Sequence, residues 1–393
     1  MKKNQLIQYH VKIKTQTPLH IGSGQGILKK YQYLYNRNKQ EVCLLDERKW
    51  ISLIGQKGLW NNYMQYVLAC SRDARNTDPN LYNWVRRNNI KDAEIQQAVR
   101  SRSQTYVDKA NLNDIHPLIA QHDGTLYIPG SSIKGFIRSA ILHHIISQDE
   151  RYSRQYWNDL KREMGSSLKQ YAKEKNLNRI INAIEEKALL TLQEVKDAQA
   201  NERRKNKMSA TVMRGILISD AICTQPRSQT PTIVVQKIDV SPDKNMNEKP
   251  EPIFRECISP GTEFSATITL DTSMTSTIGI DSFEALQKIL NRYINFAYAK
   301  QHEIFGQRYQ NTFRTLQGAS LVLGGGTGFH TKTLIRSIAP DEEEARRVIV
   351  QWLDTAFHGH THSVDHKISP RKLKITHRST QAELMGLCSL TEA

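Results

Sequence analysis

The stretch from Leu126 to Ile146 constrains the fold most strongly, because a strand pattern, a turn and a helix pattern follow one another in it without interruption. Its first three residues are predicted to form a short strand that ends at the turn Pro129-Gly130. Ser131 and Ser132 are predicted to cap the helix that follows. Its apolar positions recur at helical spacing and should face a core: Ile133, Ile137, Ala140, Ile141, His144 and Ile145.

The start of this helix also carries two cations, Lys134 and Arg138, four residues apart on another face. Gly135 between them lets a second backbone approach closely. Backbone N–H groups at a helix N-terminus, two serine hydroxyls and two cations together suit a phosphate-bearing ligand. No Asp or Glu occurs between Gly124 and Gln148, so no acidic residue of the stretch opposes an anion. A capped helix with two solvated cations is the alternative interpretation.

Charge points to the same class of ligand. The chain of 393 residues has 55 Lys and Arg against 39 Asp and Glu, a net charge of +16 that favours a polyanionic partner. Its length suggests two domains. It has no apolar run of about 18–20 residues and no apolar export signal near the N-terminus, so we expect a cytoplasmic protein with no membrane partner. Five scattered cysteines form neither a disulfide framework nor a Cys-x-x-Cys metal site.

Two further glycine-containing loops lie in windows without acidic residues. The first, residues 17–26, follows a predicted strand at Leu6–Thr15 and precedes Lys29 and Lys30; residues 1–40 contain no Asp or Glu. The second, Gly324–Lys332, follows a short apolar strand, and residues 304–340 again contain no acid. Acidic residues gather elsewhere in the chain. This segregation predicts a surface that binds a polyanion.

The Gly324 loop does not match the known nucleotide-binding fingerprints. A phosphate-binding P-loop requires Gly before its Lys, but Thr331 precedes Lys332. The dinucleotide fingerprint requires a glycine where Phe329 stands. A nucleotide-dependent enzyme is therefore disfavoured, and no cofactor is predicted.

Histidines leave two alternatives open. His20 and His330 each lie beside a glycine loop and are candidates for phosphate or base contact. The three loops contain no carboxylate, so metal-dependent phosphodiester cleavage is not predicted, whereas metal-free RNA cleavage by either histidine stays an alternative. A second group of four histidines could form a zinc site or a polar loop: His358, His360, His362 and His366. Their spacing and the absence of a nearby Cys favour the polar loop, so no metal site is predicted.

The order of strand and helix patterns predicts an α+β protein with two units. We place the first domain at residues 1–210, with helical insertions at about 59–112 and 151–207, and the second at residues 211–393. Strands are predicted at 214–219, 232–239, 254–258, 263–270, 319–323, 372–376 and 387–390, and helices at 282–299 and 341–357. Ser259-Pro260-Gly261 is predicted as the turn of a hairpin between the third and fourth of these strands.

The three loops together resemble the RAMP superfamily of CRISPR-associated RNA-binding proteins. Ile128–Arg138 matches that superfamily's Pro-Gly-Ser-Ser-hydrophobic-Lys-Gly-x-hydrophobic-Arg signature. Leu19–Gly24 resembles its loop after the first strand, and Leu323–Phe329 resembles the glycine-rich loop of its second half. Spacing, size and the Gly-Gly-Gly-Thr-Gly-Phe form are most similar to the Csm subunit five family of type III-A effector complexes.

The resemblance implies tandem ferredoxin-like, RRM-like (RAMP) domains with helical insertions, in a complex assembled along a CRISPR RNA. In that family the subunit caps the backbone filament near the 3′ end of the RNA and participates in crRNA maturation and antiviral defense. Its filament-forming relative cleaves target RNA with an Asp in the loop after the first strand. Residues 18–40 of this chain contain no Asp or Glu, which predicts a non-catalytic subunit.

The implied partners are the CRISPR RNA, other Csm subunits, especially the filament-forming RAMP subunit, and host nucleases. The residues predicted to contact the RNA or a neighbouring subunit are His20, Gly22, Ser23, Gly24, Lys29, Lys30, Gly130, Ser131, Ser132, Lys134, Arg138, Gly324, Gly325, Gly326, Thr327, Gly328, His330 and Lys332. The alternative is a RAMP endoribonuclease that processes guide RNA.

Overall fold

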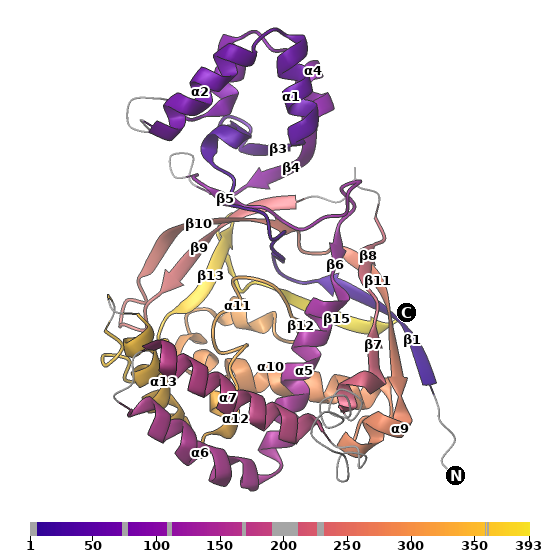
Figure 1. The fold of residues 1–393 in the computed structure, drawn as a ribbon, viewed down its shortest axis with the longest axis vertical. Helices are drawn as coiled ribbons and strands as arrows, with labels where there is room; N and C mark the ends of the chain where they lie inside the picture. The colour runs from indigo at the N-terminus through magenta and orange to yellow at the C-terminus, as the bar shows by residue number, and fades with distance from the viewer. Residues whose placement is uncertain are drawn as a thin grey trace.

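Two sheets with helices around them form the protein, as a computed structural model shows (Figure 1). The structure describes residues 6–72, 78–107, 112–166, 170–190, 211–225, 232–357, 359 and 361–393. The α+β fold predicted from the sequence is confirmed. Two members of the histidine group, His358 and His360, lie outside the described residues.

The first sheet brings the two ends of the described chain together. Its strands are, in spatial order, β12 (Leu321–Val322), β15 (Leu387–Glu392), β1 (Leu6–Thr15), β11 (Glu263–Asp271), β8 (Ala221–Cys223) and β6 (Tyr127–Ile128), with β7 (Ile216–Ile218) also on β11. Strand β1 alternates as predicted, because Val11 and Ile13 are fully buried while Lys12 and Lys14 are exposed.

Eight strands of the described chain form the second sheet. Its strands are, in spatial order, β14 (Gln381–Glu383), β13 (Leu373–Arg378), β9 (Thr232–Val240), β4 (Val99–Thr105), β3 (Glu41–Leu45) and β2 (Tyr33–Asn36). Strand β10 (Glu248–Ile258) pairs with β9 and with β5 (Ile115–His116). Both sheets therefore take strands from both sides of residue 210, and the domain boundary proposed there stays a prediction.

The hairpin predicted at Ser259-Pro260-Gly261 is wrong. Strand β10 ends at Ile258 in the second sheet, and β11 begins at Glu263 in the first. The turn residues therefore carry the chain from one sheet to the other. Alternation within each strand is local, whereas the choice of partner strand is set by long-range packing, which explains the error.

The helix of the opening motif is α5 (Gly130–Ser147), and its cap differs from the prediction. Pro129 occupies the N-cap position, so Ser131 and Ser132 lie in the first turn. The carboxylate of Asp220 accepts a hydrogen bond from the Gly130 N–H at 2.7 Å. Most of the predicted apolar face of α5 is buried, including Ile133, which has no exposed surface, whereas His144 and Ile145 are only half-buried. Helix α5 packs against α10 (Phe283–Phe305), whose N-cap residue is Ser282.

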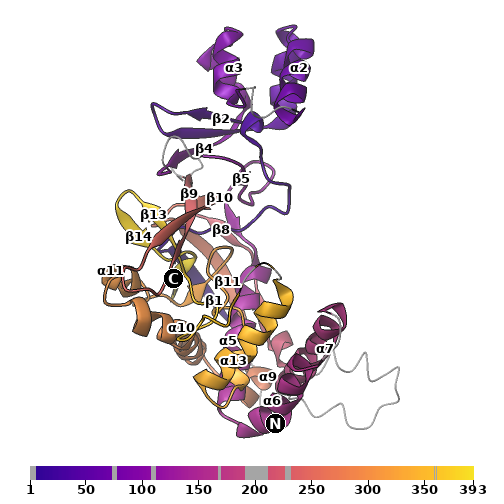
Figure 2. The same ribbon diagram turned by 90° about the vertical axis from the view of Figure 1, so that its left-hand side faces the viewer.

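Four helices stand at one end of the molecule in both views (Figure 1, Figure 2). They are α1 (Glu47–Gln56), α2 (Trp60–Arg72), α3 (Leu81–Arg87) and α4 (Asp92–Ala98). Trp50 and Trp84 meet edge to face, with ring centroids 6.4 Å apart, in a hydrophobic cluster separate from the main core. Helices α2 to α4 fall within the predicted range 59–112, whereas α1 precedes it and β4 occupies Val99–Thr105, where helix was predicted. That this range is an insertion stays a prediction.

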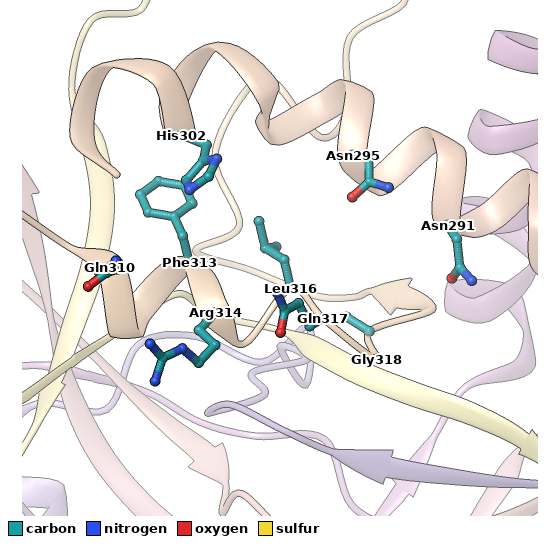
Figure 3. A pocket seen from close by; sticks show the side chains of 10 residues that line it. Asn291, Asn295, His302, Gln310, Phe313, Arg314, Leu316, Gln317 and Gly318 are labelled. Carbon is teal, nitrogen blue, oxygen red and sulfur yellow. The ribbon is translucent and has the colours of Figure 1, made fainter. Parts of the chain in front are cut away.

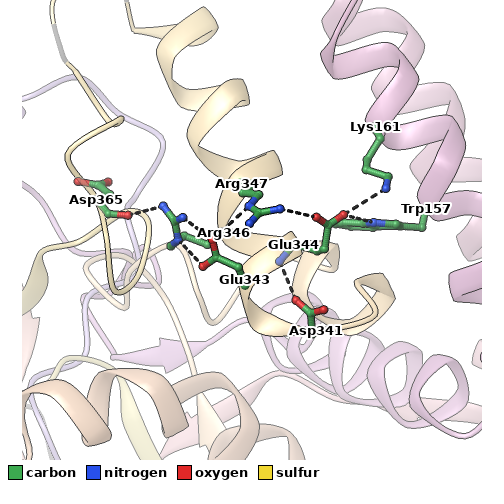
Figure 4. A network of polar contacts seen from close by, with 8 residues as sticks. All are labelled: Trp157, Lys161, Asp341, Glu343, Glu344, Arg346, Arg347 and Asp365. Atoms are coloured by element: carbon green, nitrogen blue, oxygen red, sulfur yellow. Dashed lines mark hydrogen bonds and ion pairs between the residues drawn. The ribbon is translucent and has the colours of Figure 1, made fainter.

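Two more helices, α6 (Glu150–Met164) and α7 (Gln170–Leu189), correspond to the described part of the insertion predicted at 151–207. Helix α6 is tied to α13 (Glu342–Ala356) by the carboxylate of Glu344, as Figure 4 shows. That carboxylate accepts hydrogen bonds from Lys161 Nζ at 3.1 Å and from Trp157 Nε1 at 3.3 Å, while Arg347 approaches it from its own helix at 3.2 Å. The insertion is thus joined to the C-terminal part of the chain.

The remaining helices are short: η1 (Lys30–Gln32), η3 (Val212–Gly215), α9 (Thr272–Thr275), η5 (Ser276–Ile278), α11 (Gln310–Arg314) and α12 (Ile335–Ile338).

Candidate nucleic-acid interface

The loop after β1 and the glycine-rich loop after β12 lie against each other. The N–H of Gly325 donates a hydrogen bond to the carbonyl oxygen of His20 at 2.8 Å. Gly324 has φ of +77°, and a Cβ built there would overlap the same carbonyl oxygen. Only glycine fits this contact without strain. Two of the three sequence motifs therefore form one surface.

His20 lies beneath that surface as a neutral imidazole. Its side chain is buried, with Nδ1 2.7 Å from the carbonyl oxygen of Glu256, which can only accept a hydrogen bond. Nδ1 must therefore carry the hydrogen, and Nε2, on the side of Gly22, is unprotonated. The pKa of His20 is lowered to about 4, mainly by burial; the hydrogen bond to Glu256 opposes this effect, and the nearby Arg255 and His116 add to it.

Arg255 on β10 supplies a cation next to both loops. Its Nε lies 3.6 Å from the position of a Cβ built on Gly325. Its buried Nη1 has no hydrogen-bond partner in the part of the chain that the structure describes. Burial lowers the pKa of its guanidinium, which nevertheless stays charged. A buried cationic N–H without a partner is costly, which makes this atom a candidate contact for an anionic or polar ligand.

Two more basic side chains complete the group. Arg255 pairs in register with His116 on β5, and the His116 and His20 ring centroids lie 6.4 Å apart. Lys332 is exposed and donates from Nζ to the carbonyl oxygen of Gly324 at 3.0 Å. Burial, followed by repulsion from Arg255, lowers the pKa of His116 and of Lys332. We call His20, His116, Arg255 and Lys332, together with the two loops, the loop interface.

Carboxylates close to the loop interface are already bound within the protein. Glu256 is buried and accepts hydrogen bonds from Ser101 Oγ at 2.7 Å and from the Leu118 N–H at 2.9 Å. Asp239 on β9 accepts a hydrogen bond from Lys374 Nζ at 2.7 Å. Both carboxylates therefore have donors outside the loop interface, and Asp114, which acts on His116, pairs with Lys29.

The α5 motif contributes only part of what its sequence suggested. The Gly130 N–H already donates its hydrogen bond to Asp220, and Glu185 on α7 forms an ion pair with Arg138. Two acidic residues from other parts of the chain thus reach a helix start whose own stretch lacks them. Lys134 is half-buried, and burial lowers its pKa. The structure also places Arg138 in one cavity with Lys332, which links α5 to the loop interface.

The other predicted residues fall into exposed and buried sets. Gly22 and Gly24 are exposed, and the N–H of Ser23 donates to the carbonyl oxygen of Pro117 at 3.2 Å. Lys29 forms an ion pair with Asp114 at 2.5 Å, and Lys30 begins η1.

Within the glycine-rich loop, Gly326 and Gly328 have φ of +91° and +89°. Thr327 and His330 are buried. The Nε2 of His330 lies 3.2 Å from the carbonyl oxygen of Pro370, and burial lowers the pKa of His330 to about 4. The predicted contact of these residues with RNA stays a prediction.

Sequence reasoning missed Arg255 and His116. Each stands on a strand and is adjacent only in space to the loops, so no motif spacing connects them. Their signal is weak: Arg255 is a charged residue within the apolar strand pattern predicted at 254–258.

A second pocket, of about 580 Å³, lies between α10, α11 and the loop before β12, apart from the cavity that contains Arg138 and Lys332 (Figure 3). Its lining is rich in amides, from Asn291, Asn295, Gln310 and Gln317, and contains a single Lys or Arg, Arg314. None of the residues predicted to contact RNA lines it.

Among the residues with a described position, no three His, Cys, Asp or Glu side chains converge as metal ligands. In the predicted histidine cluster, His362 instead contacts Asp365, with Nδ1 3.1 Å from Oδ2. No described helix combines the length and apolar character that crossing a membrane requires.

The fold and the loop interface define a known class of protein. The family model of the RAMP superfamily matches residues 12–329, and the chain belongs to that superfamily, as its motifs predicted. The likeness to the Csm subunit five family is confirmed as well. The chain is 24% identical over 376 residues to a CRISPR-system Csm5 protein of Enterococcus italicus, with 89% of this chain and 86% of that protein covered.

Other relatives agree. A Csm5 protein of Mycobacterium tuberculosis is 26% identical over 310 residues, covering 77% of this chain and 73% of that protein. Among solved structures, a chain of a Csm–crRNA–target RNA ternary complex of a type III-A CRISPR–Cas system has a TM-score of 0.63 at 17% identity, covering 98% of this chain and 100% of that chain. The crystal structure of T. onnurineus Csm5 has a TM-score of 0.59 at 18% identity, covering 96% of this chain and 99% of that chain. These structures show the same fold.

Proposed function

We propose that this chain is a non-catalytic, RNA-binding subunit of a type III-A Csm effector complex. The observation that carries the proposal is the loop interface, where two glycine loops meet beside Arg255 and Lys332 is exposed. The buried Nη1 of Arg255 has no hydrogen-bond partner among the residues that the structure describes. Exposed backbone groups together with these cations suit the phosphates of single-stranded RNA.

The finer role is proposed by analogy with the relatives. The Csm5 name of the curated relatives and the fold shared with a chain of a Csm–crRNA complex support a place on the CRISPR RNA beside other Csm subunits. We propose that the chain caps the backbone filament formed by the filament-forming RAMP subunit, near the 3′ end of the RNA. We further propose that it takes part in crRNA maturation together with host nucleases.

Two features support a non-catalytic role. Residues 18–40 carry no Asp or Glu that could act in a metal-dependent cleavage. His20 and His330 are buried, and each has a pKa of about 4, far below the value that suits a proton-transferring group at pH 7. The alternative, a metal-free ribonuclease, would use the unprotonated Nε2 of His20.

RNA binding should depend on the two cations at the interface. We expect the double variant Arg255→Gln, Lys332→Gln to bind single-stranded RNA about tenfold or more weakly, because two charge-assisted contacts are lost. The log–log dependence of affinity on salt should become shallower by about 1.4, that is about 0.7 for each phosphate contact. Fluorescence anisotropy at several salt concentrations measures both quantities.

The matched control is Lys12→Gln, Lys14→Gln, which removes the same charge from the exposed face of β1, where both lysines pair with Glu263. It should leave the slope nearly unchanged. Equal losses in the two double variants would show that net charge, and not the loop interface, determines RNA binding.

Chemistry is tested separately. We expect the purified protein to leave guide and target RNA intact, with or without Mg²⁺ or Mn²⁺, over several hours at pH 7.5. Denaturing gel electrophoresis of labelled RNA is the measurement. Cleavage that persists in chelator and disappears in His20→Ala or His330→Ala would establish the ribonuclease alternative.

A further inference from the structure

We propose that a cavity between α5, α6, α7 and residues 329–335 accepts one unstacked base of the bound RNA. This inference rests on the proposed function, since it specifies how the RNA is held beyond its backbone. The cavity has a volume of about 360 Å³. Ligand pockets start at about 300 Å³, so the space suits a single nucleotide and is too small for a partner helix.

Part of the cavity lining is apolar and aromatic. It includes Leu160 and Met164 on α6 and Leu177 on α7, which are all buried. Phe329 and Trp352 also line it, with stacked rings whose centroids lie 6.0 Å apart at an interplanar angle of 27°. Unstacked RNA bases bind to surfaces of this kind, because each base has an apolar face.

The lining also carries two cations, Arg138 on α5 and Lys332, with Glu185 as the one carboxylate among the lining residues. Among the described residues, Arg138 pairs through Nη2 with Glu185, so its remaining N–H donors can reach a phosphate. Glu185 can accept a hydrogen bond from an amino group of the base.

Position favours a nucleotide over a partner's side chain. Lys332 lines the cavity and also donates to the carbonyl oxygen of Gly324, so the cavity opens directly beside the loop interface. An RNA strand that crosses the Gly324 loop can turn one base inward while its phosphate stays between Lys332 and Arg138. The amide-lined pocket of Figure 3 lacks this continuity, because it shares no residue with the loop interface.

The experiment fills the cavity without changing its charge. Ile181 on α7 lines it and is half-buried, so Ile181→Trp should occupy the space of the base. Ala183, two residues further on, is exposed and outside the lining, which makes Ala183→Trp the matched control. A second filling variant, Asn178→Trp, changes an exposed lining residue and covers the case in which Ile181→Trp does not fold.

Each protein is tested with single-stranded RNA that carries an abasic nucleotide at one position at a time. For the unchanged protein we expect one position whose abasic form binds about 5- to 30-fold more weakly, the effect of losing one base stack. In Ile181→Trp or Asn178→Trp, intact RNA should bind more weakly by a similar factor, and the abasic nucleotide should cause no further loss. Ala183→Trp should behave as the unchanged protein.

Two results would overturn the inference. In the first, the unchanged protein shows no sensitive position, or the filling variants retain it. In the second, the filling variants bind RNA normally and lose a neighbouring Csm subunit in pull-downs, which would identify a protein side chain as the occupant. Failure of the proposed function differs from both, because the unchanged protein would then not bind intact RNA.

Discussion

Replacing Gly324 with alanine will destabilise the protein by about 2–5 kcal/mol and weaken its binding to single-stranded RNA by tenfold or more. Gly324 has φ of +77°, a conformation that costs a residue with a Cβ about 1–2 kcal/mol. The new methyl group would also overlap the carbonyl oxygen of His20, and relieving such an overlap costs about 1–3 kcal/mol more. The loop must move away from His20, which breaks the 2.8 Å hydrogen bond from Gly325.

Because that bond joins the two glycine loops, its loss separates the backbone groups proposed to contact RNA. Urea unfolding measures the loss of stability, and anisotropy measures RNA affinity. The matched control is Gly55→Ala on α1, outside the loop interface, where a Cβ meets no atom within 4 Å and φ lies outside the left-handed region. It should leave RNA affinity unchanged and should not destabilise the protein. If Gly324→Ala unfolds and binds RNA like Gly55→Ala, the two loops do not act as one surface.

Long periodic elements could be predicted from the sequence because their signals are local. Strand β1 alternates over its whole length, and α10 shows its apolar face together with a serine cap at Ser282. Helix α13 follows from the acidic first turn beginning at Glu342 and the cap at Asp341. In each case the same apolar–polar pattern recurs at every helical turn or every second strand residue, so the prediction does not depend on what the element packs against.

Partnerships between distant segments could not be predicted. The Ser259-Pro260-Gly261 turn has the composition of a hairpin, yet it connects two sheets, because β10 pairs with β9 and β11 with β1. The Pro-Gly-Ser-Ser stretch predicts a serine cap, yet Asp220 takes the hydrogen bond of Gly130. In both places a long-range contact replaces a local one of similar strength.

The same limit applies to the candidate site. Windows without acidic residues do not guarantee surfaces without them, since Glu185 reaches Arg138 from α7. The loop interface depends on Arg255, whose neighbours His20, His116 and Gly325 come from three other segments. The motifs identified which loops matter, whereas the chemistry of the site appears only after folding.

Acidification from pH 6.5 to 5 will destabilise the protein, and His330→Gln will make this dependence shallower by about 1 kcal/mol per pH unit. Burial lowers the pKa of His20, His143 and His330 to about 4 in the folded protein, against about 6.5 when unfolded. The unfolded chain therefore binds more protons between these values. The stability present above pH 6.5 is lost as the pH falls toward 4, by about 2 kcal/mol for each fully buried histidine at pH 5.

His330 gives the clearest test because its surroundings are defined. After burial, Arg336 lowers its pKa, while the carbonyl oxygen of Pro370 and the carboxylate of Glu342 raise it. Glutamine does not titrate but can still donate a hydrogen bond to Pro370. Urea unfolding at half-unit steps of pH gives the slope, and His122→Gln, which changes an exposed histidine, is the control.

Burial raises the pKa of Glu256. Its effect on the pH dependence of stability is therefore opposite to that of the buried histidines. Glu256 is present in every variant, so the difference between slopes reports His330 alone. A slope for His330→Gln equal to that of His122→Gln would mean that His330 is protonated in the folded state near pH 6. An imidazolium there would also restore His330 as an acid for metal-free RNA cleavage, so this measurement bears on function as well as on stability.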